Sequence, residues 1–225
     1  MKLNRKVRLL ITCDSSAGAG KTTASKYLSK HFGLSLLTSG LLYRYVAYKL
    51  IASNKKVSDN TFLKKITKKI NPKNLKNQKL YSPYVTDYAA RIAKVKKIRM
   101  LLRNYQNKFA KKRLAILEGR DQGVLFKNAD IKFFFKCTLK VAAKRRFKEF
   151  RKTNKKITFQ EVHKSIKMRN HVDSTRKFSP LRIPKGAVIV DTTKINKKQM
   201  FGRISKVIED KLFLKYGRNY KARQK

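Results

Sequence analysis

Short apolar runs alternate along the chain with longer stretches in which apolar residues recur every three or four positions. The first pattern is typical of strands buried on both faces, and the second is typical of amphipathic helices. Strands are predicted at 7–13, 34–37, 114–118, 131–137 and 187–191. Helices are predicted at 21–31, 41–53, 88–111, 139–152, 159–172 and 196–214. This alternation indicates α/β units around a parallel sheet.

Two stretches interrupt the alternation. Residues 54–86 are polar and rich in Lys and Asn, with two prolines, and are predicted to form a small inserted subdomain. Residues 151–158, RKTNKKIT, are predicted to be a mobile connection between two basic helices. Either stretch is also compatible with a plain surface loop. Insertions at such places are typical of phosphate-transfer folds that close over their substrates.

The chain is strongly basic. It carries 59 Lys plus Arg against 12 Asp plus Glu, a formal net charge of +47 at pH 7. Such a charge attracts polyanions, so nonspecific nucleic-acid binding is expected. The basic residues are spread along the whole chain, which favours a general lysine bias over a dedicated nucleic-acid surface. The stretch 215–225, KYGRNYKARQK, is the best candidate for a basic contact tail, with a frayed terminus as the alternative.

Length and composition narrow the class of protein further. A chain of 225 residues is long enough for one well-buried domain. Its longest apolar runs are far too short to span a bilayer, so no membrane association is predicted. Cys13 and Cys137 lie in apolar runs and suggest no disulfide framework, which fits a reducing cytoplasm.

Residues 12–23, TCDSSAGAGKTT, form a small-residue loop between a predicted strand and a predicted helix. Backbone N–H groups and a helix N-terminus in this arrangement make a cradle for phosphate. Lys21 can reach the β and γ phosphates of ATP, and the Thr22 hydroxyl can ligate Mg2+ directly or through water. The predicted ATP-binding residues are Ser15, Ser16, Ala17, Gly18, Ala19, Gly20, Lys21, Thr22 and Thr23. Ser15 stands where the usual pattern has its first glycine, and a positive φ there would cost about 1 kcal/mol or more.

Three further stretches narrow the phosphate acceptor. They read LSLLTSGLLYRYV at 34–46, LAILEGRDQG at 114–123 and RNHVDSTRKFSPL at 169–181. Together with the glycine-containing loop, their motifs DSSAGAGKTT, TSGLLYR, EGRDQG and RNHVDSTR resemble bacterial cytidylate kinases, which are P-loop nucleoside monophosphate kinases. The resemblance runs in order from about residue 7 to 214. Each motif alone is weak or moderate, whereas the ordered set is specific.

The resemblance implies an α/β, three-layer P-loop NTPase fold with a parallel central sheet, a nucleoside-monophosphate-binding insertion and a lid. The corresponding boundaries are a core at about 7–53, 87–150 and 173–214, an insertion at about 54–86, a lid at about 151–172 and the basic tail at 215–225. The implied reaction converts CMP and ATP to CDP and ADP with Mg2+, with dCMP as a second acceptor. The implied enzyme is a cytoplasmic monomer whose partners are small-molecule nucleotides.

Matching positions carry the family's roles onto this chain. The implied CMP-binding residues are Ser39, Arg44, Arg99, Arg120, Asp121, Asp173 and Arg176. The implied catalytic residues, which face the transferring phosphate, are Lys21, Arg145, Arg146 and Arg169. Phosphoryl transfer needs positioning and positive charge more than covalent chemistry, so a ring of cationic groups is chemically reasonable. A carboxylate such as Asp121 or Asp173, paired with Arg176, is suited to read the amino group of cytosine and reject uracil.

Some positions depart from the family pattern. Thr38 and Asn170 replace acids, Glu118 replaces aspartate, and Ala90 replaces a serine of the CMP site. We hypothesise that the missing hydroxyl weakens CMP affinity or allows UMP as an acceptor. Two alternatives stay open: a P-loop kinase acting on UMP or another small molecule, and a catalytically weakened P-loop protein that binds nucleic acid through its basic surface.

Overall fold

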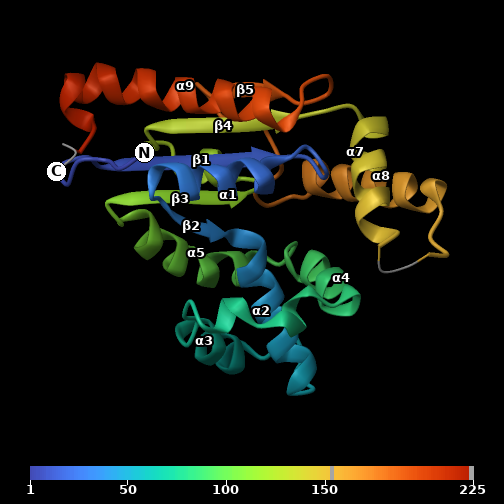
Figure 1. Cartoon of the computed structure of the whole chain (residues 1–225). Helices are drawn as coiled ribbons and strands as arrows, with labels where there is room; N and C mark the ends of the chain where they lie inside the picture. The colour runs from blue at the N-terminus through green and yellow to red at the C-terminus, as the bar shows by residue number, and fades with distance from the viewer. Residues whose placement is uncertain (153–154, 223–225) are drawn as a thin grey trace. The chain divides into compact units, whose positions relative to one another are not determined.

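The computed structural model describes residues 1–152 and 155–222 (Figure 1). Residues 153–154 of the predicted connection and lid, and residues 223–225 of the predicted tail, lie outside the described residues. The chain forms two compact units: residues 1–36 with 113–225, and residues 37–112. The second unit contains the predicted insertion at 54–86, but it also contains residues 37–53 and 87–112, which the sequence analysis assigned to the core.

A five-stranded sheet confirms the predicted α/β fold. Its strands are β1 (Leu9–Ser15), β2 (Ser35–Thr38), β3 (Leu114–Gly119), β4 (Ile131–Lys136) and β5 (Val188–Asp191), in the order β2-β3-β1-β4-β5. β1 pairs in parallel with β3 and β4, and β4 pairs in parallel with β5. All five predicted strands are found, with bounds shifted by at most two residues. In a parallel sheet the carboxyl ends of neighbouring strands lie at one edge, which is where such folds bind ligands.

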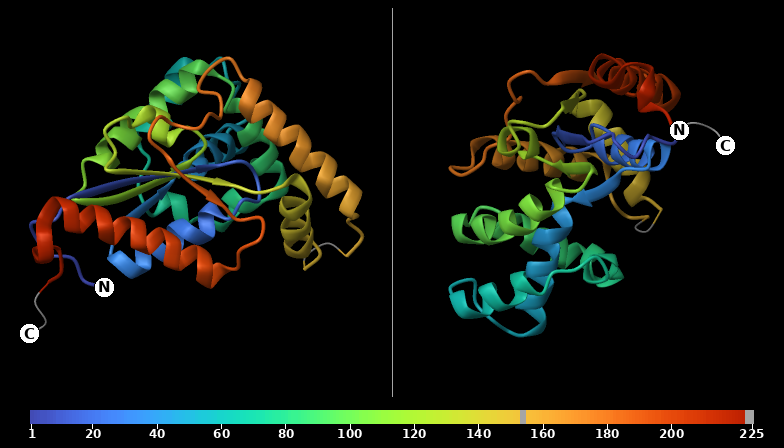
Figure 2. Two further views of the ribbon diagram at one scale, coloured as in Figure 1. Left: turned by 90° about the horizontal axis from the view of Figure 1, so that it is seen from above. Right: turned by 90° about the vertical axis from the view of Figure 1, so that its left-hand side faces the viewer.

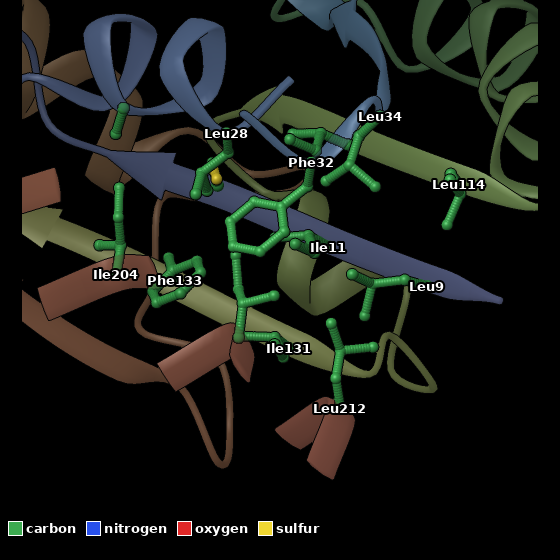
Figure 3. Close-up of a cluster of buried hydrophobic side chains, with 14 of the residues drawn as sticks. Leu9, Ile11, Leu28, Phe32, Leu34, Leu114, Ile131, Phe133, Ile204 and Leu212 are labelled. Carbon is green, nitrogen blue, oxygen red and sulfur yellow. The ribbon is translucent and has the colours of Figure 1, made fainter. Parts of the chain in front are cut away.

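Two helices of the first unit bury one face of the sheet. α1 (Lys21–Phe32) and α9 (Lys197–Tyr216) pack their apolar sides on residues of β1, β3 and β4 (Figure 3). Ile11, Leu28, Phe133 and Ile204 in this core have no measurable exposure. α1 ends at Gly33, whose φ of 67° permits the left-handed cap that lets its N–H bond the Ser29 carbonyl.

α7 (Leu139–Phe150) and α8 (Phe159–Thr175) lie beyond the carboxyl ends of β1 and β4 (Figures 1 and 2). α8 begins with a capping box in which the Thr158 hydroxyl accepts from the Glu161 N–H and the Glu161 carboxylate accepts from the Thr158 N–H. A second buried cluster joins these helices to the glycine-containing loop, and it consists of Ala17, Ala142, Ala143, Val162 and Ile166. The region predicted as the lid is thus packed on that loop.

The second unit is helical. It contains α2 (Ser39–Ala52), α3 (Asn60–Lys68), α4 (Pro83–Ile92) and α5 (Lys96–Ala110), with two short 3-10 helices at Asn74–Lys76 and Gln78–Tyr81. The single helix predicted at 88–111 is wrong, because the chain breaks between Ile92 and Lys96 into α4 and α5. Leu63, Leu80, Ile98 and Leu102 form part of the buried interior of this unit.

Residues 2–4 pair with residues 220–222, so described segments near the two termini lie side by side (Figure 2). Leu3 and Lys221 form an antiparallel bridge, and the Asn4 N–H donates to the Tyr220 carbonyl at 2.9 Å. Tyr220 is buried, so this residue of the predicted tail is packed, whereas Lys215, Arg218 and Lys221 are exposed. None of the helices among the described residues combines the length and hydrophobicity that a membrane crossing demands.

Candidate nucleotide-binding site

The glycine-containing loop connects the end of β1 at Ser15 to the start of α1 at Lys21. Gly18 and Gly20 have φ of 74° and 88°, a conformation that glycine adopts without a steric penalty. Ser15 is the last residue of β1 and does not have a positive φ, so the strain expected at this position does not arise. Its hydroxyl donates to the Ser16 carbonyl at 2.6 Å. Serine is therefore compatible with the geometry of this loop.

Lys21 and Thr22 meet one carboxylate from β3. Glu118 Oε1 lies 3.8 Å from Lys21 Nζ and accepts a hydrogen bond from Thr22 Oγ1 at 2.5 Å. Burial lowers the pKa of Lys21 to about 7, the positive charge of Arg120 adds to this effect, and Glu118 opposes it. An anionic ligand at Lys21 would therefore favour its protonated form.

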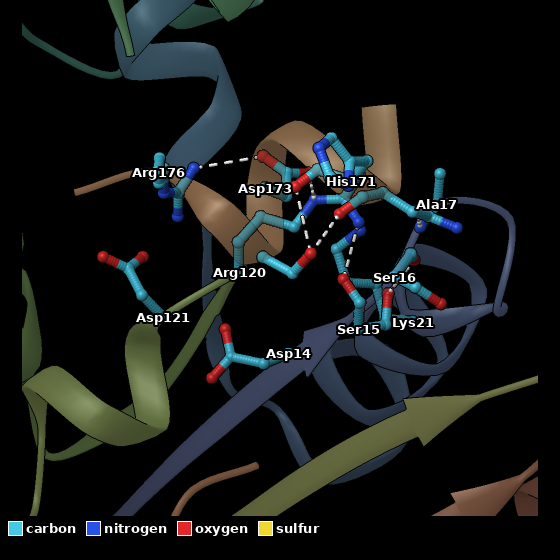
Figure 4. Close-up of polar contacts among 12 residues, drawn as sticks. Asp14, Ser15, Ser16, Ala17, Lys21, Arg120, Asp121, His171, Asp173 and Arg176 are labelled. Atoms are coloured by element: carbon cyan, nitrogen blue, oxygen red, sulfur yellow. Dashed lines mark hydrogen bonds and ion pairs between the residues drawn. The ribbon is translucent and has the colours of Figure 1, made fainter. Parts of the chain in front are cut away.

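The exit of β3 carries a cluster of alternating charges (Figure 4). Arg120 donates to the Ser15 carbonyl at 2.6 Å, and its Nε lies 3.3 Å from Asp173 Oδ2. Asp173 Oδ1 also accepts from Arg176 at 3.1 Å. Burial lowers the pKa of Arg120 to about 10, nearby Arg169 contributes to the lowering, and Asp173 opposes it. The structure thus brings three predicted CMP-binding residues, from α8 and from the residues that follow β3 and α8, beside the glycine-containing loop, or phosphate loop.

A buried carboxylate links the phosphate loop to the predicted acceptor residues. Asp14, next to Ser15, accepts from the N–H groups of Gln122 at 2.9 Å and Gly123 at 2.6 Å. Burial raises the pKa of Asp14 to about 7, while these two N–H groups oppose the rise. The bonds hold the start of the short helix α6 (Gln122–Leu125), which directly follows Asp121.

Arg145 of α7 contacts the loop from its other side. Its guanidinium donates to the Gly18 carbonyl at 3.4 Å, and to the hydroxyl and carbonyl of Thr192 at 2.9 and 2.6 Å. The Thr192 hydroxyl in turn donates to the Ala19 carbonyl at 3.1 Å. Arg145 therefore braces the backbone of the phosphate loop against the segment after β5.

The other two predicted catalytic arginines differ in their surroundings. Arg146 donates to Glu149 at 2.8 Å, and its guanidinium lies 5.5 Å from the ring centroid of Phe150. Arg169 of α8 interacts electrostatically with Asp173 and Arg146. Its positive charge also contributes to the lowered pKa values of Lys21 and Arg120.

The remaining predicted acceptor residues lie in the second unit. Ser39 opens α2 and is buried. On the same helix, Arg44 lies with its guanidinium 5.3 Å from the ring centroid of Tyr81. Arg99 of α5 is 7% exposed and lies 5.5 Å from the ring of Tyr43. Each arginine thus rests on an aromatic face, which favours a fixed guanidinium.

The donor atoms at the loop fit a hard divalent cation. Among the described residues, no group of three or more His, Cys, Asp or Glu side chains is placed to hold a metal ion. The Thr22 hydroxyl and the Glu118 carboxylate nevertheless lie side by side, and both are oxygen ligands that Mg2+ accepts. Mg2+ usually completes its shell with water and substrate phosphates, so two protein oxygens are sufficient for a site of this kind.

Sequence reasoning missed several contacts of the site. Asp14, Thr192 and Tyr81 were not predicted, and Asn170 was noted only as a departure from a family pattern. Its Oδ1 accepts from the Ala17 N–H at 2.9 Å. Acids are scarce in this chain, and that scarcity is a signal from which Asp14 could have been found. The other contacts join residues far apart in sequence and have no local pattern.

Comparisons with known proteins identify the family of the chain. A family model described as cytidylate kinase matches residues 11–210. The cytidylate kinase of Fusobacterium nucleatum is 33% identical over an alignment of 213 residues, with 89% of this chain and 97% of that protein covered. The cytidylate kinase of Clostridium tetani is 31% identical, with 94% of this chain and 99% of that protein covered. An uncharacterized protein of known structure from Eubacterium ventriosum has a TM-score of 0.54 and 14% identity, covering 90% of this chain and 99% of its own, which supports the fold alone.

Proposed function

The chain belongs to the cytidylate kinase family, and from this premise we propose that it transfers the terminal phosphoryl group of ATP to CMP or dCMP. An oxygen of the acceptor phosphate forms a bond to the γ phosphorus of ATP. The bond between that phosphorus and the bridging oxygen of ADP breaks, and the products are ADP and CDP or dCDP. The observation that carries the proposal is the phosphate loop with Lys21, Arg120 and Arg169 clustered beside it.

ATP binds at the loop in this proposal. Residues 15–23 supply backbone N–H groups, and Lys21 supplies a positive charge to the terminal phosphates. The support is the left-handed conformation at Gly18 and Gly20, together with the half-buried position of Lys21 at the start of α1. Arg145 keeps the loop in shape through Gly18 and Thr192, a supporting role in addition to the predicted contact with the transferring phosphate.

CMP binds at the exit of β3 in this proposal. Arg120, Asp173 and Arg176 form one network of ion pairs, and Asp121 follows Arg120 directly. A carboxylate of this network would accept a hydrogen bond from the cytosine amino group, which uracil lacks. Arg44 and Arg99 would bind the acceptor phosphate in the bidentate manner of guanidinium groups, with Ser39 beside them.

The transferring phosphate needs positive charge as it moves. Lys21, Arg146 and Arg169 would supply it. Lys21 Nζ lies 3.8 Å from the buried Glu118 carboxylate, and Arg146 pairs with a mostly exposed Glu149. Mg2+ would be held by Thr22, directly or through water, with Glu118 beside it. When bound, the ion would neutralise charge on the phosphates and orient them.

A coupled assay of ADP release tests the proposal. Wild-type protein with ATP and Mg2+ is offered CMP, dCMP, UMP and AMP, and we expect turnover with CMP and dCMP that Lys21→Ala abolishes. The exposed Ala90 on α4 offers no hydroxyl to the acceptor, so a measurable rate with UMP is part of the expectation. Absence of turnover with every acceptor would reject the proposed kinase activity, and a rate with UMP above the rate with CMP would identify UMP as the preferred acceptor.

Location and partners follow from the same proposal. A cytoplasmic monomer is proposed, since ATP and nucleoside monophosphates are cytoplasmic metabolites and both cysteines are free. The charge of +47 should add weak nucleic-acid binding that falls steeply with salt. Nanomolar binding at 200 mM salt, without kinase turnover, would instead identify a nucleic-acid-binding protein that keeps the loop.

A further inference from the structure

A side-chain hydrogen bond attaches α8 to the phosphate loop. Asn170 Oδ1 accepts from the Ala17 N–H at 2.9 Å, across 153 positions of sequence. Ala17 is 2% exposed, and its methyl group packs in the small cluster between α7 and α8. A buried backbone N–H without an acceptor is costly, so the Asn170 carbonyl is part of what keeps this end of α8 in place.

Arg169 precedes Asn170 on the same helix. Consecutive helical residues point about 100° apart, so the direction of Asn170 largely determines that of Arg169. The charge of Arg169 acts on Lys21 in the loop, on Arg120 at the end of β3, and on Asp173 one turn further along α8. Holding Asn170 on the Ala17 N–H therefore holds the Arg169 guanidinium near the place where phosphates are expected.

The chemical type of residue 170 has a separate consequence. An asparagine oxygen accepts a hydrogen bond while the side chain stays neutral. An aspartate would also accept from the Ala17 N–H, but its negative charge would attract Arg169 and repel the phosphates of an arriving ATP. The neutral Asn170 oxygen makes the hydrogen bond that anchors α8 without adding a negative charge. The Arg169 guanidinium therefore stays available to the phosphates of the ligand.

We propose that Asn170 is a positioning residue for phosphoryl transfer, acting by fixing Arg169 over the phosphate loop through the Ala17 N–H. This inference rests on the proposed function. Loss of the acceptor and addition of a charge should therefore affect different steps of catalysis. Loss of the acceptor misplaces Arg169 during transfer, whereas an added charge weakens ATP binding.

Two substitutions separate these effects. We expect Asn170→Ala to lower kcat about 10- to 100-fold, as for a misplaced catalytic group, with the Kd for ATP changed less than about twofold. We expect Asn170→Asp to keep kcat within about threefold and to raise the Kd for ATP about fivefold or more. Lys167→Ala, an exposed residue on the same helix, is the matched control and should change neither. Equal kcat values for Asn170→Ala and wild type would overturn the proposal, and so would a tighter Kd for ATP in Asn170→Ala with kcat unchanged.

Amide hydrogen exchange supplies a readout that needs no turnover. In the nucleotide-free protein, the peptide that contains Ala17 should exchange faster in Asn170→Ala and stay protected in Asn170→Asp and Lys167→Ala. Unchanged protection in Asn170→Ala would show that the bond does not hold the loop, and would overturn the proposal. If wild type transferred phosphate to no nucleoside monophosphate, the proposed function would fail, and the exchange and ATP-binding measurements would still decide the role of Asn170.

Discussion

Gly18 and Gly20 provide a comparison between two glycines of one loop that share a backbone conformation and differ in their neighbours. Both have positive φ, 74° and 88°, so an alanine at either position costs about 1–2 kcal/mol of backbone strain. A Cβ at Gly20 would meet only the Met200 sulfur at 3.8 Å, an ordinary contact. A Cβ at Gly18 would lie 2.9 Å from the Ala142 Cβ and 3.0 Å from both the Cα and the carbonyl oxygen of Ala142.

The contact at Gly18 involves the backbone of α7, which cannot swing aside as a side chain can. Either the loop or the helix must move, and overpacking of this kind costs about 1–3 kcal/mol. We therefore expect Gly20→Ala to lower the free energy of unfolding by about 1–2 kcal/mol and Gly18→Ala by about 2–5 kcal/mol. Urea unfolding measures both, and a change of midpoint without a change of m-value would show that stability changed while the surface exposed on unfolding did not.

A second substitution tests the cause. Ala142→Gly removes the atom 2.9 Å from the new methyl group but leaves the two backbone atoms in place. The Gly18→Ala, Ala142→Gly double variant should thus recover part of the loss, with a favourable coupling of about 0.5–2 kcal/mol after the cost of a helical glycine is subtracted. Equal losses at the two glycines, or a coupling of zero, would refute the steric reasoning.

Three further predictions concern charge, capping and the acceptor. Burial lowers the pKa of Lys21 to about 7, so Lys21 is mostly neutral in the free protein at pH 8, and bound ATP should raise this pKa so that ATP binds with uptake of about one proton. Calorimetry in buffers of different ionisation enthalpy measures the proton uptake. Equal uptake by Lys21→Met would contradict the prediction. Thr158→Ala removes the hydroxyl cap of α8 and should cost about 1 kcal/mol in urea unfolding, so an unchanged midpoint would argue against the capping box. Tyr81→Ala removes the ring whose centroid lies 5.3 Å from the Arg44 guanidinium, and it should raise the KM for CMP about 3- to 10-fold without raising the KM for ATP. Tyr84→Ala is the control, because the Tyr84 side chain is 70% exposed, and it should leave both KM values unchanged.

Local pattern was sufficient for the sheet and the phosphate loop. Every strand is an apolar run bounded by polar or small residues, and the loop is a continuous motif whose glycines take the positive φ that it requires. The break between α4 and α5 escaped prediction because residues 93–95, Ala-Lys-Val, contain neither glycine nor proline. The short helix α6 escaped for another reason: its first N–H groups are satisfied by Asp14, more than 100 positions earlier.

The sequence predicted which residues belong to the candidate site, but it did not predict which residues from different elements contact one another. The motifs indicated Arg120, Asp173 and Arg176 as a group, and the structure joins them in one ion-pair network. They gave no indication that Arg145 would brace Gly18 through Thr192, or that Asn170 would accept from Ala17, since each bond joins segments that only the folded chain brings together. Sequence spacing selects residues that share a helix face, whereas partners across elements depend on packing.

The distribution of acids connects the composition of this chain to its site. The chain has 12 acidic residues against 59 Lys and Arg, so the acids are too few to neutralise most of the basic side chains. Of these acids, the three that are buried are Asp14, Glu118 and Asp121, and all lie at the carboxyl ends of β1 and β3 or directly after them. A buried carboxylate is expensive unless hydrogen bonds or cations compensate it, and Asp14 and Glu118 have such partners in the N–H groups of α6 and in Lys21 and Thr22. At this edge of the sheet Glu118 gives Lys21 and Thr22 a fixed negative partner, which can hold their geometry before nucleotides arrive.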